Sequence, residues 1–335
     1  MTIVMGLLAV AGFSTATPTS PQAVPTRYEA GHFYAVPETR DGQRLKLVVD
    51  TGGGGANGMY WITRATADRL HLHTRNCSIG SQHITVAPIP DYRPGHALPP
   101  PVKGACGASV IVIANHSGIY GDGQLGAGYL PGRVWTFDYP HHRLTLEGSG
   151  WRPAPAVHTT PLHFPHNSKG GKASGFARIV IHVDGQPLGM LLDTGATAHP
   201  TPDGERASGT PVTARDYGVT SYITTSMLER WHKAHPHWRV VENGDDLFGP
   251  KHPMRLIEVP HVEIAGWSVG PVWFTERPDR NFHVFMSSMM DKQVEGAVGA
   301  NIFRHFAMTL DYPHDTAYFQ CERGCKAAAR QPPGP

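Results

Sequence analysis

The apolar residues of the chain fall into short runs that are separated by turn signals. Residues 33–36 and 45–49 are two such runs, and an Asp-Gly pair at 41–42 lies between them. Asp-Gly between two strand-like runs is typical of a β-hairpin. Residues 176–183 alternate apolar and polar side chains, as a half-buried strand does, and Asp-Gly at 184–185 follows them. The pattern therefore predicts a β-hairpin at both places.

The hairpin pattern occurs twice because the chain is a duplication. An Asp-Thr-Gly triplet begins nine residues after Asp41 and again nine residues after Asp184. In a second block, Gly126 and Gly299 are each followed twelve residues later by the Asp of a Thr-(Phe/Leu)-Asp-Tyr-Pro segment. Two blocks that recur in the same order and at the same spacing indicate two copies of one structural unit.

A third correspondence predicts a strand that leads into a short helix in each copy. It covers residues 61–70 and 222–231, and Ser226 with Glu229 has the spacing of a helix capping box. The distance from the Asp-Thr-Gly triplet to this strand is about 18 residues longer in the second copy. The extra residues fall within 201–220, and we expect them to form a surface loop.

Composition supports a β-rich chain. Of the 335 residues, 38 are Gly and 30 are Pro, and only 17% are charged. Frequent turn residues with few charges disfavour a helical bundle, whose surface helices need Lys, Glu and Arg. An apolar content of 40% is sufficient for a core, and the length predicts about two domains. We therefore expect an all-β protein with a few short helices.

The two copies predict two lobes. The first covers residues 30–147 and the second 176–320, with 148–175 as linker and entry to the second lobe and 321–335 as a tail. Residues 1–16 contain an apolar run that ends in small residues, which predicts a secretory signal peptide. Nothing later in the sequence is long and apolar enough to predict a membrane span.

Four cysteines agree with an exported protein, either secreted or periplasmic, because disulfides persist outside the cytosol. Four cysteines allow three pairings, and the sequence does not decide between them. One pairing closes a small loop between Cys321 and Cys325 and leaves Cys77 to pair with Cys106. The spacings fit neither a thioredoxin-type redox motif nor a zinc ribbon, so they predict structural disulfides.

Charge and motif content disfavour several classes of ligand. The net charge is +2 without any run of five or six basic residues, which argues against a nucleic-acid partner. The 21 histidines make the chain far more cationic in acid. His232, His235 and His237 lie close together, but no His-Glu-x-x-His motif accompanies them, so no metal site is predicted. The glycine run at 52–55 lacks the Gly-Lys-Ser/Thr of a phosphate loop.

Each Asp-Thr-Gly triplet follows a very apolar strand, which drives the Asp carboxylate to the edge of a hydrophobic core. Gly52 and Gly195 permit tight loops whose backbone N–H groups can reach that carboxylate. The side chains of Thr51 and Thr194 can hydrogen-bond across to the matching loop of the other copy. One such triplet is weak evidence, but two at corresponding positions point to a shared site.

A pseudo-twofold axis between the copies would bring Asp50 and Asp193 face to face. Two carboxylates so close share one proton and titrate as a pair. The ionised member can act as general base on a water between them, and the protonated member can donate to a carbonyl oxygen. This arrangement predicts metal-free hydrolysis of an amide bond.

The chain resembles the aspartic proteases, specifically a single-chain, two-lobed form of the retropepsin-like and pepsin-like fold. The likeness rests on the two Asp-Thr-Gly triplets and on the Leu-Gly and Val-Gly pairs that end at Gly126 and Gly299, and the Asp-Tyr-Pro strand ends look like those of bacterial members. The resemblance implies two homologous acid-protease β-barrel lobes related by pseudo-twofold symmetry. It also implies a monomeric aspartic endopeptidase that binds an extended polypeptide, with Asp50 and Asp193 as the catalytic dyad and no cofactor.

The resemblance further implies a set of residues that support the catalytic loops. They are Thr51, Gly52, Gly126, Thr194, Gly195 and Gly299. A flap hairpin should close over the peptide, and Tyr92 is the candidate for its substrate-binding residue.

One departure from the family lies directly after the first triplet, where the family usually has Ser, Thr or Ala. Ala196 agrees with the family but Gly53 does not, so neither loop carries the hydroxyl that touches the catalytic carboxylate in pepsin-like members. This departure leaves an alternative open: a catalytically weak or inactive bilobal protein that binds peptides or acts as an inhibitor.

Overall fold

The computed structural model describes residues 18, 20–55, 58–80, 82–101, 106–115, 121–155 and 157–328. The predicted signal peptide lies outside these residues. None of the helices within them is long and apolar enough to cross a membrane.

The first copy of the repeat folds around an eight-stranded sheet. Its strands, in spatial order, are β2 (Thr26–Glu29), β3 (His32–Ala35), β4 (Leu47–Val49), β9 (Gly123–Leu125), β5 (Trp61–Thr63), β8 (Ser109–Ile113), β7 (Gln82–Pro88) and β6 (Arg75–Ile79). The short helix α1 (Arg64–Arg69) follows β5, as the sequence predicts. Strands β4 and β9 run parallel, as do β5 and β8, and the other neighbours are antiparallel.

The second copy folds around a ten-stranded sheet that contains the same arrangement. Its strands are β18 (Val240–Asp245), β19 (Met254–Val259), β22 (Val272–Arg277), β17 (Ser221–Thr224), β23 (Gly296–Val298), β14 (Gln186–Leu192), β13 (Arg178–Val183), β20 (Val262–Ile264), β21 (Trp267–Val269) and β26 (Cys325–Ala327). The series β18-β19-β22-β17-β23-β14-β13 repeats β6-β7-β8-β5-β9-β4-β3 strand for strand, with the same parallel and antiparallel pairings. The duplication in the sequence is therefore a duplication of topology.

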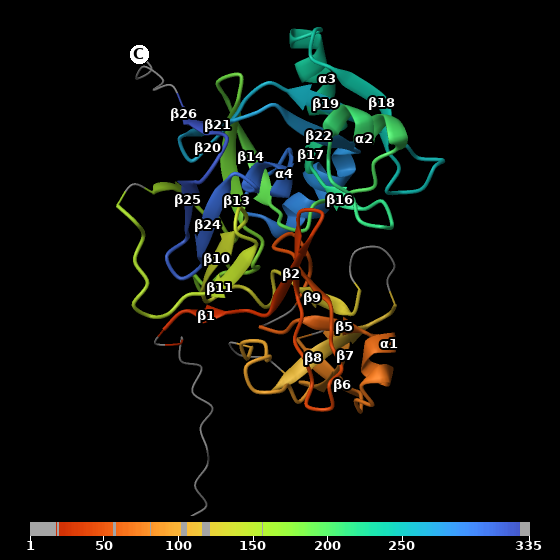
Figure 1. The fold of residues 1–335 in the computed structure, drawn as a ribbon, viewed down its shortest axis with the longest axis vertical. Coiled ribbons are helices and arrows are strands. Elements are labelled where there is room, and N and C mark those ends of the chain that lie inside the picture. Colours follow the sequence, from red (N-terminus) through yellow and green to blue (C-terminus); the bar gives the residue numbers. More distant parts are fainter. Residues whose placement is uncertain are drawn as a thin grey trace, which may run out of the picture.

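A third, six-stranded sheet is shared by both copies. It runs β1 (Gln22–Ala23), β11 (Arg143–Leu146), β10 (Val134–Asp138), β24 (Phe306–Asp311), β25 (Thr316–Cys321) and β12 (His158–Pro161). Strands β10 and β24 are antiparallel and are centred on Thr136 opposite Thr309, whose hydroxyl oxygens lie 2.8 Å apart. A pseudo-twofold axis passes through this pair. Figure 1 shows the first-copy strands β5–β8 at the bottom, β17–β19 and β22 at the top, and the shared sheet at the left.

One continuous hydrophobic core connects the two copies. It contains Trp135 and Phe137 of β10 and Phe306 and Met308 of β24, all fully buried. The shared sheet therefore fixes how the lobes sit relative to each other, since separating them would expose these side chains to water. The expected fold class, mainly β with two lobes and pseudo-twofold symmetry, is confirmed.

The helix after β17 differs from the predicted one at its start. Helix α3 (Thr225–Ala234) begins one residue before Ser226, so the proposed capping box of Ser226 and Glu229 is wrong. The Ser226 amide donates instead to the Asp279 carboxylate, and Glu229 pairs with Arg255. Tertiary partners from another part of the chain take over the role that a local cap would have.

The inserted segment of the second copy is more regular than a surface loop. It contains helix α2 (Pro202–Ser208), and β16 (Gly218–Val219) pairs with β15 (Thr197–Ala198). The hydroxyl of Thr201 accepts the Gly204 amide at the start of α2, and Gly209 ends the helix in the left-handed conformation. An N-cap Thr followed by Pro, with Gly after the last turn, is a helix signal that the sequence contained. The described residues also contain the short helical segments η2 (Arg280–Met286), η3 (Ser287–Met289) and α4 (Ala300–Phe303).

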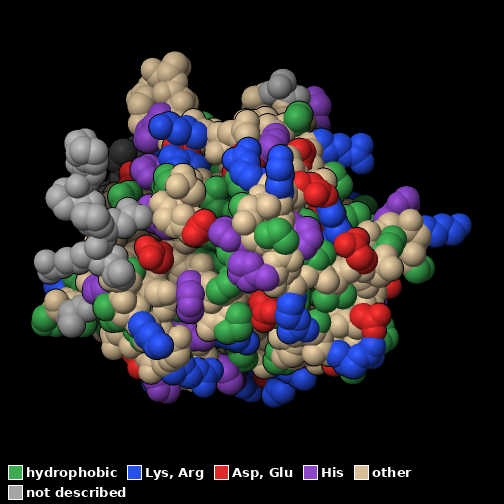
Figure 2. All heavy atoms as spheres, turned by 90° about the horizontal axis from the view of Figure 1, so that it is seen from above, with side chains coloured by type: hydrophobic (Ala, Val, Ile, Leu, Met, Phe, Trp, Pro, Cys, Tyr) green, Lys and Arg blue, Asp and Glu red, His purple; other side chains and the backbone are tan. Residues whose placement is uncertain are grey.

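Two disulfides are present, Cys77–Cys106 and Cys321–Cys325. The first joins β6 to the segment before β8, and the second links β25 to β26. On the face seen in Figure 2, basic, acidic and histidine side chains are interspersed over its described part.

Candidate active site

Two buried strands deliver the carboxyls of Asp50 and Asp193 to the centre of the molecule. Asp50 follows β4, and its amide donates to the Leu125 carbonyl of β9 at 3.0 Å. Asp193 follows β14, and its amide donates to the Val298 carbonyl of β23, also at 3.0 Å. Each Asp is therefore held to the strand that runs parallel to its own.

The threonines of the two triplets lock the loops together across the pseudo-twofold axis. The amide of Thr51 donates to the Thr194 hydroxyl at 3.1 Å, and the Thr194 amide donates to the Thr51 hydroxyl at 3.0 Å. Each hydroxyl also donates onward, from Thr51 to the Leu192 carbonyl and from Thr194 to the Val49 carbonyl, at 2.7 and 2.8 Å. The cross-loop hydrogen bonds expected from the sequence are present.

Gly52 and Gly195 bring the loops close enough for the carboxyls to meet. The Gly52 amide donates to Asp50 Oδ1 at 2.9 Å, and the Gly195 amide donates to Asp193 Oδ1 at 3.0 Å. A Cβ on Gly52 would lie 2.5 and 2.6 Å from the carboxyl oxygens of Asp193. A Cβ on Gly195 would lie 2.5 Å from both oxygens of Asp50. Each glycine therefore leaves room for the carboxyl of the other lobe.

Gly126 lies against the backbone of the first Asp-Thr-Gly loop, and Gly299 lies against the backbone of Thr220, the residue before β17. A Cβ on Gly126 would lie 2.1 Å from the Gly54 carbonyl oxygen, and one on Gly299 would lie 1.8 Å from the Thr220 carbonyl oxygen. The Gly299 amide also donates to the Ser221 hydroxyl at 3.0 Å. Only a residue without a side chain allows these close approaches.

The two carboxyls hydrogen-bond each other in an almost dry environment, with 5% of Asp50 and 8% of Asp193 exposed. Burial raises the pKa of Asp193 well above its ordinary value, and the charge of Asp50 raises it further. Burial also raises the pKa of Asp50, but hydrogen bonds from Asp193, Gly52, Gly53 and Gln124 lower it. Both carboxyls therefore resist ionisation, and they titrate as a pair.

Gln124 of β9 is a site residue that sequence reasoning missed. Its side-chain amide nitrogen donates to Asp50 Oδ2 at 2.5 Å, and the residue is buried. A Cβ on Gly53 would lie 1.5 Å from that nitrogen, so glycine at this position makes space for the Gln124 amide.

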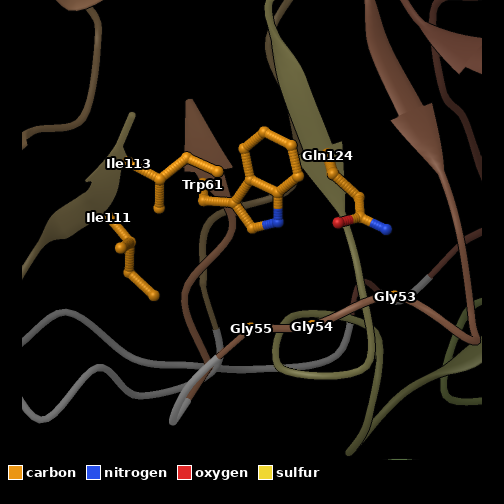
Figure 3. A pocket seen from close by; sticks show the side chains of 7 residues that line it. All are labelled: Gly53, Gly54, Gly55, Trp61, Ile111, Ile113 and Gln124. Atoms are coloured by element: carbon orange, nitrogen blue, oxygen red, sulfur yellow. The ribbon is translucent and has the colours of Figure 1, made fainter. Parts of the chain in front are cut away.

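A pocket opens next to Asp50 on the first-lobe side. It is lined by Gly53, Gly54, Gly55, Trp61, Ile111, Ile113 and Gln124. Figure 3 shows the Trp61 indole beside Gln124, with Ile111 and Ile113 beyond it and the glycine run underneath. The walls are apolar, and Gln124 is the polar group that separates them from the Asp50 carboxyl.

The equivalent region of the second lobe is filled by an ion pair. Ile113 pairs with Thr63 on β5, and the corresponding partner of Thr224 on β17 is Arg277. The Arg277 guanidinium lies 3.2 Å from the Asp245 carboxylate and is 3% exposed. The first lobe therefore has an apolar pocket in this region, and the second lobe has a buried ion pair.

Tyr92, the candidate flap residue, packs against the first-lobe core. Its hydroxyl lies 2.8 Å from that of Tyr60, and its backbone bridges Thr39. A different hairpin, β6–β7, contributes Ile79 and Ile84 to the apolar cluster that contains pocket residues. The substrate-binding role of Tyr92 stays a prediction.

Of the three histidines near the end of α3, His235 makes an ion pair and ring contacts. His235 Nε2 lies 2.9 Å from the Asp184 carboxylate, and its ring stacks on Trp238. The described part of the chain holds no cluster of three or more His, Cys, Asp or Glu side chains arranged to bind a metal.

No family model and no curated protein matches the chain by sequence. The structure is similar to the aspartic proteinase from Irpex lacteus, at 10% identity and a TM-score of 0.48, over 90% of this chain and 97% of that one. It is also similar to basic 7S globulin from soybean, at 10% identity and a TM-score of 0.44, over 90% of this chain and 94% of that one. Both TM-scores are below 0.5, so the chemistry of this chain rests on its own residues.

Proposed function

We propose that the protein is an aspartic endopeptidase that hydrolyses peptide bonds with a water molecule activated between Asp50 and Asp193. The observation that carries this proposal is the pair of buried carboxyls, on two loops joined by the hydrogen bonds that the backbone amide of each Thr donates to the hydroxyl of the other. Such a pair supplies a base and an acid at one point without a metal ion.

The surroundings of the two carboxyls assign a different role to each. Asp50 accepts hydrogen bonds from the Gly52 amide and the Gln124 side chain, which favour its ionised form. Asp193 lacks an equivalent of the second donor, because Ala196 and Ala297 occupy the matching positions. Asp50 would therefore take the proton of the water, and Asp193 would donate its proton to the peptide carbonyl oxygen.

The proposed substrate is a polypeptide in extended conformation. The apolar pocket of Trp61, Ile111 and Ile113 would accept one apolar side chain next to the scissile bond. We further propose that the protein is exported, which agrees with its two disulfides. We also propose that it is a monomer.

The test is digestion of denatured casein across acidic and neutral pH, with and without a statine-type inhibitor. Asp50→Asn and Asp193→Asn should each lower kcat/KM on the order of 10³-fold or more, because each removes one half of the acid–base pair. Asp68→Asn changes an exposed Asp of α1 and serves as the control. Hydrolysis that survives both dyad substitutions would reject the proposal.

The alternative is a peptide-binding protein without catalysis, which the unusual Gly53 favours. It predicts that the inhibitor binds, measured by calorimetry, while casein stays intact at every pH.

A further inference from the structure

We propose that Gln124 is a positioning residue that holds the outer carboxyl oxygen of Asp50, in the space that Gly53 leaves open. The inference deepens the proposed function and rests on it. Gln124 lies at the centre of β9, is only 2% exposed, and places its amide nitrogen 2.5 Å from Asp50 Oδ2. Figure 3 shows its carboxamide directed toward the glycine run.

The size of residue 53 is matched to the reach of residue 124. A Cβ at residue 53 would lie 1.5 Å from the Gln124 nitrogen and 2.5 Å from Asp50 Oδ2. Any larger residue at 53 would therefore displace the Gln124 amide from the carboxyl. The absence of a hydroxyl after the first triplet is compensated by a donor from a neighbouring strand.

The second lobe has a different pair of residues at the same positions. Gln124 is opposite Trp61 in the sheet, and Ala297 is opposite Tyr222, the residue that corresponds to Trp61. Ala196 stands where the first loop has Gly53. The first lobe combines Gly with Gln and the second combines Ala with Ala, and only the first combination brings a hydrogen-bond donor to its carboxyl.

The orientation of the Gln124 amide follows from the charge of Asp50. An ionised carboxylate only accepts hydrogen bonds, so the NH2 end of the amide must face it. In a buried site such a hydrogen bond stabilises the charged form and directs the oxygen lone pairs of Asp50. Asp50 is then held as the ionised member of the pair, with its carboxyl plane fixed by donors on both oxygens.

Two titratable groups act on Asp50 from the elements packed around it. Asp193 faces it from the loop after β14. Tyr139, at the end of β10, has a pKa raised well above its ordinary value by burial first and then by Tyr28, Asp193 and Asp50. Both groups are neutral when Asp50 alone is ionised, so the Gln124 dipole acts on the carboxylate without a competing charge.

The test compares the protein with its Gln124→Met and Gln124→Glu variants. Met fills a similar volume without a donor, so the acid-side midpoint of the kcat/KM profile should move to higher pH by about one unit or more. Glu places a carboxyl against Asp50 and should move the midpoint further. Gln186→Met, at an exposed position of β14, should leave the profile unchanged. An unchanged midpoint in both Gln124 variants overturns the proposal.

A spectroscopic measurement separates this proposal from the proposed function. In protein labelled with 13C at Asp carboxyls, Gln124→Met should raise the titration midpoint of Asp50, whether or not peptides are hydrolysed. In the unsubstituted protein, the side-chain amide protons of Gln124 should shift with the same midpoint as the Asp50 carboxyl. If the Gln124 amide shifts do not follow the Asp50 titration, the proposed role of Gln124 is overturned, even if casein is cleaved. If casein is not cleaved but the shifts follow the titration, only the proposed function is rejected.

Discussion

Thr51 and Thr194 each donate a backbone amide to the hydroxyl of the other, and each hydroxyl donates to a carbonyl on the strand that carries its partner. All of these groups are buried. The pair thus joins the two lobes at the point where their carboxyls meet, without any charged side chain.

Removing one hydroxyl of this pair should destabilise the whole molecule. Thr51→Val keeps the shape but leaves the Leu192 carbonyl and the Thr194 amide without their partners in a buried site. We expect the free energy of unfolding to fall by about 2–4 kcal/mol, measured by urea denaturation. Thr194→Val should lose a similar amount, because it makes the symmetric contacts. Thr159→Val, at an exposed position of β12, should change stability by less than about 0.5 kcal/mol, and an equal loss there would contradict the assignment.

The close approach of Gly195 to Asp50 makes the site intolerant of a methyl group. In Gly195→Ala, the new Cβ would lie 2.1 Å from Asp50 Cγ, so the carboxyl must move. A displacement of this size should lower kcat/KM by on the order of 10²-fold. Gly150→Ala adds the same methyl group where no atom lies within 4 Å and should leave hydrolysis unchanged. Full activity in Gly195→Ala would mean that the loops separate during catalysis.

His32 connects the first lobe to the Asp-Thr-Gly loop of the second. It is fully buried at the start of β3, and its Nε2 lies 3.2 Å from the Thr197 hydroxyl, which donates to the Gly195 carbonyl. Burial lowers the pKa of His32 to about 4. The unfolded chain binds this proton near pH 6.5, so the folded state loses stability as pH falls from about 6.5 to about 4.

Replacing His32 should flatten the acid side of the stability curve. The shift from 6.5 to about 4 corresponds to about 3 kcal/mol. In His32→Gln, the difference in unfolding free energy between pH 6.5 and pH 4 should be smaller by about that amount. His252→Gln, at an exposed position, should retain the slope of the unsubstituted protein. Identical slopes in His32→Gln and the control would show that His32 takes up its proton without unfolding.

The sequence predicted the parts of the site that depend on spacing within one copy. The two Asp-Thr-Gly triplets stand at equal distances after their hairpin turns, so the duplication alone placed Asp50 opposite Asp193 and suggested the contacts between their threonines. The start of α3 could not be predicted, because the amide of Ser226 is satisfied by Asp279, far along the chain. Such long-range contacts depend on which strands become neighbours in the folded protein. The local sequence pattern around a helix carries no information about which strands these are.

Gln124 illustrates the same limit at the centre of the site. Gln124 and Asp50 are 74 residues apart in the sequence. The Gln124 side chain reaches Asp50 only because β9 pairs in parallel with β4. The sequence did contain one signal, since Gly53 and Gln124 differ from Ala196 and Ala297 at matching positions of the two copies. From the first copy to the second, the residue after the triplet becomes larger, from Gly53 to Ala196, while the residue at the matching strand position becomes smaller, from Gln124 to Ala297. Opposite changes of size at two positions indicate that their side chains are in contact.

The shared sheet has a consequence for how the two lobes can differ. Strands β10 and β24 pair antiparallel about Thr136 and Thr309, which is the self-complementary contact of a symmetric homodimer. In a dimer of identical subunits, the same residues would surround both carboxyls of the Asp pair. Neither carboxyl could then differ from the other in its hydrogen-bond partners. Because one polypeptide contains both copies, each half can change without the other. The molecule thereby combines the geometry of a dimer with a fixed polarity, because the two carboxyls have different neighbouring groups.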